Sequence, residues 1–134
     1  MKKYIGADLS ALTFDKRVAA ASDIKLAQKA SVIEKEDALG LCGEFANLVR
    51  QQIDSNALVY VFGSVIKGTA NLRSDIDTAI VSRKLDDDYF RVAAKLNGLA
   101  SKVSWDIEVH AIAYEDWCKG NPHVLEIQKW GVPV

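Results

Sequence analysis

A short apolar run that stops at a glycine, followed by two alternating aspartates, limits what this chain can fold into. Residues 58–62 read Leu-Val-Tyr-Val-Phe and end at Gly63-Ser64, and Asp75 and Asp77 open a second apolar run that ends at Val81. Short apolar runs bounded by turn residues predict buried strands. Since side chains of a strand alternate between its faces, both aspartates are expected on the same side of a sheet.

The turn and the carboxylate pair favour the same chemistry for different reasons. Gly63 has no Cβ, so its backbone can turn sharply and approach phosphate oxygens closely. Ser64 adds a hydroxyl, and a helix beginning there would offer free N–H groups to an anion. Neighbouring carboxylates repel unless a cation lies between them, and Mg²⁺ is usually held by one or two carboxylates plus substrate phosphates. The pattern therefore predicts a nucleoside triphosphate bound with a divalent metal.

Other motifs with similar residues do not fit. A P-loop needs Gly-Lys-Ser/Thr, but here Lys67 precedes Gly68 and Thr69 follows it. A calcium loop beginning at Asp75 would need Gly at position 80, which is isoleucine. A glycosidase needs carboxylates on opposite sides of a sugar, which neighbouring positions of one strand do not provide. A solvated strand face is the remaining alternative, and the depletion of aspartate in strands disfavours it.

A third acid is expected from a later segment. Residues 103–112 alternate polar and apolar side chains, which predicts a half-buried strand with Asp106, Glu108 and His110 on one face. If this strand lies beside the aspartate strand, either acid could complete a metal site. His110 could contact phosphate or the acceptor, or it could form an ordinary hydrogen bond at a sheet edge.

Together these features resemble the DNA-polymerase-β-like nucleotidyltransferase superfamily, and above all its minimal single-domain members. The resemblance covers residues 57–134. It implies an α/β (α+β) fold, in which helices flank a small mixed sheet. It also implies transfer of a nucleoside monophosphate, AMP from ATP, to a hydroxyl of a protein or other acceptor, with release of pyrophosphate.

The resemblance also implies roles for individual residues. Glu108 matches the third carboxylate better than Asp106 does, because the sequence Glu108-Val109-His110 resembles the C-terminal part of such domains. Two Mg²⁺ ions are expected when substrate is bound, one at the acceptor hydroxyl and one at the triphosphate. The expected catalytic and metal-binding residues are Asp75, Asp77 and Glu108, and the expected nucleotide-binding residues are Gly63, Ser64, Lys67 and Ser74.

The resemblance leaves more than one function open. In prokaryotes, minimal nucleotidyltransferases are often paired with a small helical toxin whose tyrosine they modify. An alternative is therefore an antitoxin-like protein that neutralises such a partner by binding, with catalysis weak or dispensable. A nucleotide-binding module without transfer is a further alternative. Three clustered acids favour an active transferase, because a pure binder has no need of them.

Length and composition set further limits. The 134 residues predict one domain, with an N-terminal helical segment (1–56) that could mediate homo-oligomerisation and a catalytic core (57–134). A net charge of −1 disfavours broad nucleic-acid binding. No apolar run approaches the ~20 residues of a membrane span. The N-terminus lacks the apolar stretch of a signal peptide, and two distant cysteines predict reduced thiols in the cytoplasm.

Periodicity and capping residues predict the remaining elements. Asp86-Asp87-Asp88 is expected to cap the helix that follows it, and Asn121-Pro122 to cap the last helix. Helices are expected from about Ser22 to the mid-thirties, over 37–53, 65–70, 87–101 and 114–119, and after residue 121, with strands over 58–62, 75–82 and 104–112.

Overall fold

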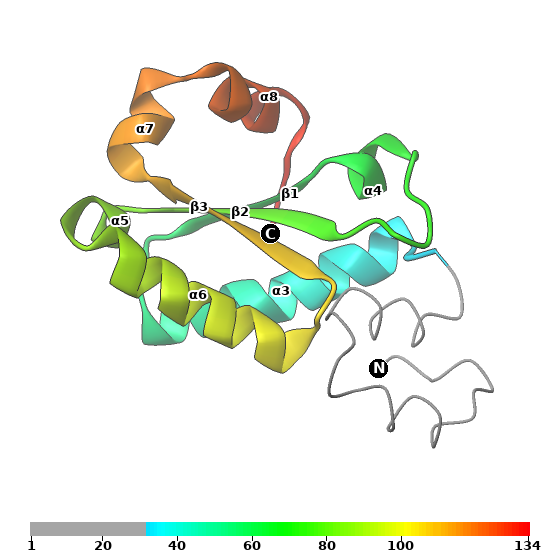
Figure 1. Cartoon of the computed structure of the whole chain (residues 1–134), viewed down its shortest axis with the longest axis horizontal. Coiled ribbons are helices and arrows are strands. Elements are labelled where there is room, and N and C mark those ends of the chain that lie inside the picture. The colour runs from blue at the N-terminus through cyan, green and yellow to red at the C-terminus, as the bar shows by residue number, and fades with distance from the viewer. Residues whose placement is uncertain (1–31) are drawn as a thin grey trace, which may run out of the picture.

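The computed structural model describes residues 32–134. The helix predicted from about Ser22 lies largely outside these residues. Within them the chain alternates helices and strands around one central sheet (Figure 1).

The sheet has four strands in the order β3-β2-β1-β4. β1 is antiparallel to both β2 and β4, whereas β2 and β3 are parallel. The sheet is therefore mixed, as the sequence predicted. The strands span Leu58–Phe62 (β1), Ile76–Ser82 (β2), Ile107–Ala113 (β3) and Val132–Pro133 (β4).

Helices cover both faces of the sheet. α3 (Lys35–Gln52) and α6 (Tyr89–Val103) lie together on one face, and α7 (Tyr114–Lys119) and α8 (Pro122–Trp130) lie on the other (Figure 1). Two short helices, α4 (Ser64–Lys67) and α5 (Lys84–Asp87), follow β1 and β2. Across the described residues, no helix combines the length and apolarity that crossing a bilayer requires.

Alternation along β2 divides the core in two. Ile76 and Ile80 pack with buried residues of α3 and α6, and Ala79 and Val81 pack with Val124 and other residues on the opposite face. Asp77 is two residues before Ala79, so its side chain lies on the same face as those of Ala79 and Val81. It therefore belongs to the α7/α8 face, at the end where β2 begins.

The last helix begins as predicted. Asn121 Oδ1 accepts a hydrogen bond from Val124 N at 2.9 Å, and Pro122 occupies the first turn. Proline is tolerated there because the first N–H groups of a helix have no intrahelical partner.

The helix predicted over 87–101 is α6, which begins and ends two residues later, and the short helix α5 precedes it across Asp88. Asp88 occupies the N-cap position of α6, but its side chain makes no capping hydrogen bond. Asp86 instead accepts a hydrogen bond from Glu115 N at 3.2 Å, in the first turn of α7. The aspartate run therefore contributes to two helices: Asp86 bonds the first turn of α7, whereas Asp88 stands at the N-cap of α6 without bonding it.

The third strand begins at Ile107, three residues later than predicted. Ser104 Oγ accepts a hydrogen bond from Asp106 N at 3.1 Å, and Ile107 N donates to Ser104 O at 3.4 Å. A serine that binds backbone two residues ahead forms a turn in competition with extended structure. The prediction that the strand already includes Asp106 was therefore wrong.

Candidate active site

Two carboxylates meet where β2 and β3 begin. Asp77 and Glu108 are paired in the parallel register of the two strands. Residues paired in this way lie side by side and project from the same face. The chain thus brings together two acids that are far apart in sequence, on the face that carries α7 and α8.

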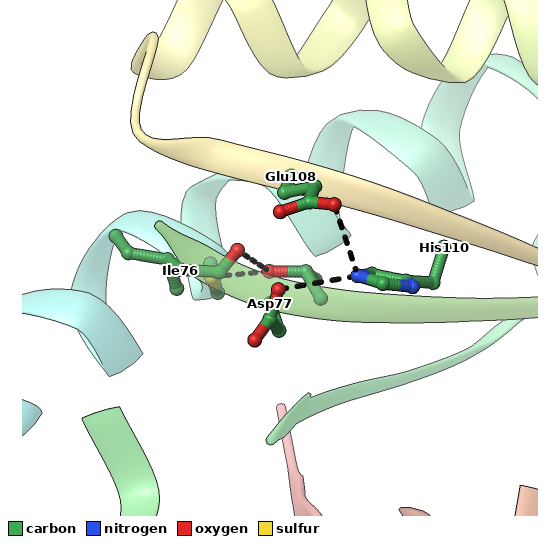
Figure 2. Close-up of polar contacts among 6 residues, drawn as sticks. Ile76, Asp77, Glu108 and His110 are labelled. Atoms are coloured by element: carbon green, nitrogen blue, oxygen red, sulfur yellow. Dashed lines mark hydrogen bonds and ion pairs between the residues drawn. The ribbon is translucent and has the colours of Figure 1, made fainter. Parts of the chain in front are cut away.

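His110 adds a nitrogen to this pair. Its Nε2 lies 3.2 Å from Asp77 Oδ1 and 3.7 Å from Glu108 Oε1 (Figure 2). One ligating atom from each of the three residues lies within 4.8 Å of the others. The side chains of Asp77 and His110 are 27% and 26% exposed, and that of Glu108 is 52% exposed. We refer to Asp77, Glu108 and His110 as the acid–histidine cluster.

The two acids change the proton affinity of His110. The hydrogen bond to Asp77 raises the pKa of the imidazole, and the negative charges of Asp77 and Glu108 raise it further. Partial burial opposes them by disfavouring the charged ring, but the net pKa is raised. The protonated ring therefore balances part of the negative charge of the cluster.

The turn after β1 is fitted to Asp77. Gly63 has φ of +81°, a region that L side chains rarely adopt, and a Cβ built there would overlap Asp77 Oδ2. Phe62, the residue before it, is the register partner of Asp77 on β1. Gly63 is therefore required both by the turn and by the carboxylate beside it.

An aromatic group borders the cluster. The ring of Phe62 meets His110 edge-on at 4.9 Å between centroids, and it meets His123 similarly at 5.6 Å. The two imidazole rings are 5.5 Å apart. Sequence reasoning did not bring Phe62 and His123 to the site. The Asn121-Pro122 cap was the available signal for His123, since it fixes where α8 begins.

With this geometry in view, comparison with known proteins identifies the family. Residues 42–128 match the sequence model of the nucleotidyltransferase domain. The chain belongs to the nucleotidyltransferase domain family. It is accordingly a transferase of nucleotidyl groups, as the resemblance implied.

A solved structure supports the fold of this nucleotidyltransferase domain. The chain is similar to a protein of Sulfolobus solfataricus described as a candidate nucleotidyltransferase, with a TM-score of 0.51 and 17% identity. The match covers 87% of this chain and 88% of that one. No curated protein sequence matches the chain.

The other expected metal ligands lie in different settings. Asp75 directly precedes β2 and, among the described residues, is not a member of the acid–histidine cluster. Asp106 is fully buried, and its carbonyl accepts a hydrogen bond from Ile76 N at 2.7 Å. Of the two candidate third acids, the structure thus places Glu108 beside Asp77 and Asp106 in the turn before β3.

The expected nucleotide-binding residues of the nucleotidyltransferase domain lie in the turn after β1, in α4 and in the loop before β2. Ser64 is the first residue of α4, directly after Gly63. Lys67 ends α4 and forms an ion pair with Glu126 of α8, with Nζ and Oε1 2.6 Å apart. Ser74 Oγ accepts a hydrogen bond from Asn71 N at 2.9 Å, which closes the loop before β2.

Proposed function

We propose that this nucleotidyltransferase domain transfers AMP from ATP to a hydroxyl group of an acceptor, with Mg²⁺ at Asp77 and Glu108. The observation that carries the proposal is the pairing of these two acids in register, beside the Gly63-Ser64 turn. Family membership supports nucleotidyl transfer in general. The nucleotide, the acceptor and the ion are proposed beyond what family membership shows.

The residues present fit a divalent cation. Carboxylate oxygens are the ligands that Mg²⁺ prefers, and Asp77 and Glu108 offer theirs within 4.8 Å of one another. Asp75 precedes β2 at the spacing that would let it hold a second ion when triphosphate adds its oxygens. Bound divalent ions would supply charge that stabilises the triphosphate and lowers the pKa of the acceptor hydroxyl.

The turn after β1 is proposed to hold the triphosphate. Gly63 lets the backbone approach phosphate oxygens, and the Ser64 hydroxyl can donate a hydrogen bond to one of them. Lys67 lies one turn further along α4 and can neutralise phosphate charge if it exchanges Glu126 for the nucleotide. Ser74 supports the same site from the loop that leads into Asp75.

The acceptor is proposed to be a partner protein. Within residues 32–134 every helix and strand belongs to the sheet or flanks it, so this part of the chain holds no separate acceptor-binding subdomain. We propose a single domain over residues 1–134 and a small helical protein as the acceptor, as the resemblance to minimal nucleotidyltransferases implies. Inhibition of such a partner by binding alone is the competing outcome.

Calorimetry and label transfer together test the function. The full chain is titrated with a non-hydrolysable ATP analogue with and without Mg²⁺, and is then incubated with α-labelled ATP and candidate acceptors. Asp77→Asn and Glu108→Gln each remove one negative charge from the site. Asp87→Asn is the matched control, because Asp87 is an exposed acid of α5 that is not a member of the cluster.

We expect Mg²⁺ to strengthen analogue binding to the parent and to Asp87→Asn, and much less to Asp77→Asn. Label should pass to an acceptor with the parent and not with Glu108→Gln. Equal analogue affinity of Asp77→Asn and the parent in Mg²⁺ would remove the metal role of Asp77. A partner that is bound and inhibited without being labelled would favour the binding-only alternative.

A further inference from the structure

The acid–histidine cluster is not made of carboxylates alone. His110 follows Glu108 by two residues on β3, so both side chains project from one face of the sheet. The imidazole is only 26% exposed, and the edge-on contact with Phe62 limits where the ring can move. The Nε2 atom is therefore held at the point toward which both carboxylates are directed (Figure 2).

The spacing of the donor atoms suits a single ion. Two ligands bonded at ~2.1 Å to one metal lie ~3.0 Å apart at a right angle and ~3.4 Å apart at a tetrahedral angle. His110 Nε2 lies 3.2 Å from the Asp77 oxygen and 3.7 Å from the Glu108 oxygen. All three atoms lie within 4.8 Å of one another, so rotations of the Asp77 and Glu108 side chains could bring them to bonding distance of a common centre.

The nitrogen changes which ion the cluster favours. Mg²⁺ is a hard cation that selects oxygen ligands, whereas imidazole suits later divalent transition metals. We propose that Asp77, Glu108 and His110 form a mixed nitrogen–oxygen site that binds a divalent transition metal ion in preference to Mg²⁺ before nucleotide arrives. This inference deepens the proposed function and rests on it for the role of the ion in transfer.

The competing explanation is that His110 only orients Asp77 by a hydrogen bond. A residue that only orients a ligand would affect the affinity for all ions in similar proportion. A residue that is itself a ligand would affect the affinity for transition metals and leave Mg²⁺ affinity nearly unchanged. The ratio of two affinities therefore separates the two roles.

The test uses the full chain without a polyhistidine tag and without nucleotide. Co²⁺ and Mg²⁺ are titrated separately by calorimetry, and Co²⁺ binding is also followed by its visible absorption. We expect Co²⁺ to bind about tenfold more tightly than Mg²⁺, and His110→Gln to weaken Co²⁺ binding by about tenfold or more. At a pH high enough to keep the imidazole neutral, the magnesium affinity of this variant should stay within about twofold of the parent, because glutamine then replaces an uncharged ring.

His123→Gln is the matched control. Its ring is 5.5 Å from that of His110, but His123 is exposed and is not a member of the cluster. It should leave both affinities unchanged. His110→Asp supplies an oxygen in place of the nitrogen, so it should lower the Co²⁺ to Mg²⁺ ratio while retaining a binding site. Thermal melts show whether each variant is folded.

Several results would overturn the inference. These are equal affinities of the parent for both ions, an unchanged ratio in His110→Gln, or an equal loss of Co²⁺ binding in His123→Gln. The proposed function has its own readout, since Asp77→Asn should lose the Mg²⁺ enhancement of ATP-analogue binding. If Asp77→Asn loses that enhancement and the His110→Gln ratio is unchanged, only the metal selectivity fails. If the enhancement persists, the proposed function fails.

Discussion

The backbone of Gly63 lies against the carboxylate of Asp77. A Cβ built on Gly63 would overlap Asp77 Oδ2 and would stand 3.2 Å from its Cγ. Residues of β1 and β2 pair up to Phe62 and Asp77, and Gly63 continues directly from that last pair. The turn and the carboxylate therefore share a space that only a residue without a side chain leaves open.

Gly63→Ala should damage both the fold and the cluster. The backbone at Gly63 has φ of +81° and ψ of −153°, and holding a residue with a Cβ there costs about 1–3 kcal/mol of stability. The methyl group would also displace the Asp77 carboxylate from its position in the cluster. Urea unfolding should show lower stability, and calorimetry should show weaker binding of Co²⁺ and of Mg²⁺ with the ATP analogue.

Gly68→Ala is the control for Gly63→Ala. Gly68 has φ of +79°, but a Cβ built there would meet nothing within 4 Å. It should cost about 1–2 kcal/mol of stability through backbone strain and leave metal binding intact. Equal metal binding by the two variants would show that Gly63 serves only the turn.

Glu108 and Asp106 should give opposite results when they are replaced. The side chain of Glu108 is half exposed, so Glu108→Gln should melt near the parent while turnover falls by about two orders of magnitude or more. Asp106 is fully buried beside Ser104, so Asp106→Ala should lower stability by about 1–3 kcal/mol. Melting curves and label incorporation measured on the same preparations check both. The reverse pattern would move the third-carboxylate role to Asp106.

Glu126 should limit the nucleotide affinity of the free protein. It forms an exposed ion pair with Lys67, which lowers the pKa of Glu126. Exposed ion pairs add little to stability, so Glu126→Gln should melt near the parent. If Lys67 binds phosphate, releasing it should raise the affinity for the ATP analogue severalfold, whereas Lys67→Ala should lower it. Unchanged affinity in both variants would remove Lys67 from the nucleotide site.

His110 should titrate above the ordinary histidine pKa of about 6.5 in the metal-free protein, because Asp77 accepts its hydrogen bond and both acids attract its charge. Protonated His110 then stabilises the fold at pH values below the unfolded pKa. That contribution is lost as pH rises through the raised, folded pKa. Histidine NMR signals followed against pH should show the raised midpoint, and Asp77→Asn should lower it. A midpoint that does not fall in Asp77→Asn would exclude the hydrogen bond as its cause.

Much of the fold followed from local patterns. The apolar run before Gly63 and the alternation after Asp75 predicted β1 and β2, and the Asn121-Pro122 pair predicted the start of α8. These features depend on neighbouring residues, which a sequence displays directly. β4 was missed because it has two residues, one of them a proline, and only its pairing with β1 defines it.

The candidate site was predictable in its residue types but not in its register. Alternation places positions 106 and 108 on one face of any strand that contains both, so sliding β3 by two residues would exchange Asp106 for Glu108 beside Asp77. The turn made by Ser104 decides between them, and it competes with an alternating pattern that looks continuous. The ion pair between Lys67 and Glu126 joins two helices distant in sequence, so only the folded chain reveals it.

The parallel pairing of β2 and β3 has a consequence for the order in which the molecule assembles. Parallel neighbours cannot be joined by a hairpin, so the chain must pass through α5 and α6 before Glu108 can reach Asp77. Strands that are distant in sequence pair slowly, whereas β1 and β2 are consecutive antiparallel strands and can pair earlier. A chain in which only β1 and β2 have paired contains Asp77 but has not yet brought Glu108 beside it. An ion that needs both acids would bind only after β2 and β3 have paired, and its binding would therefore stabilise the fully folded chain over this intermediate.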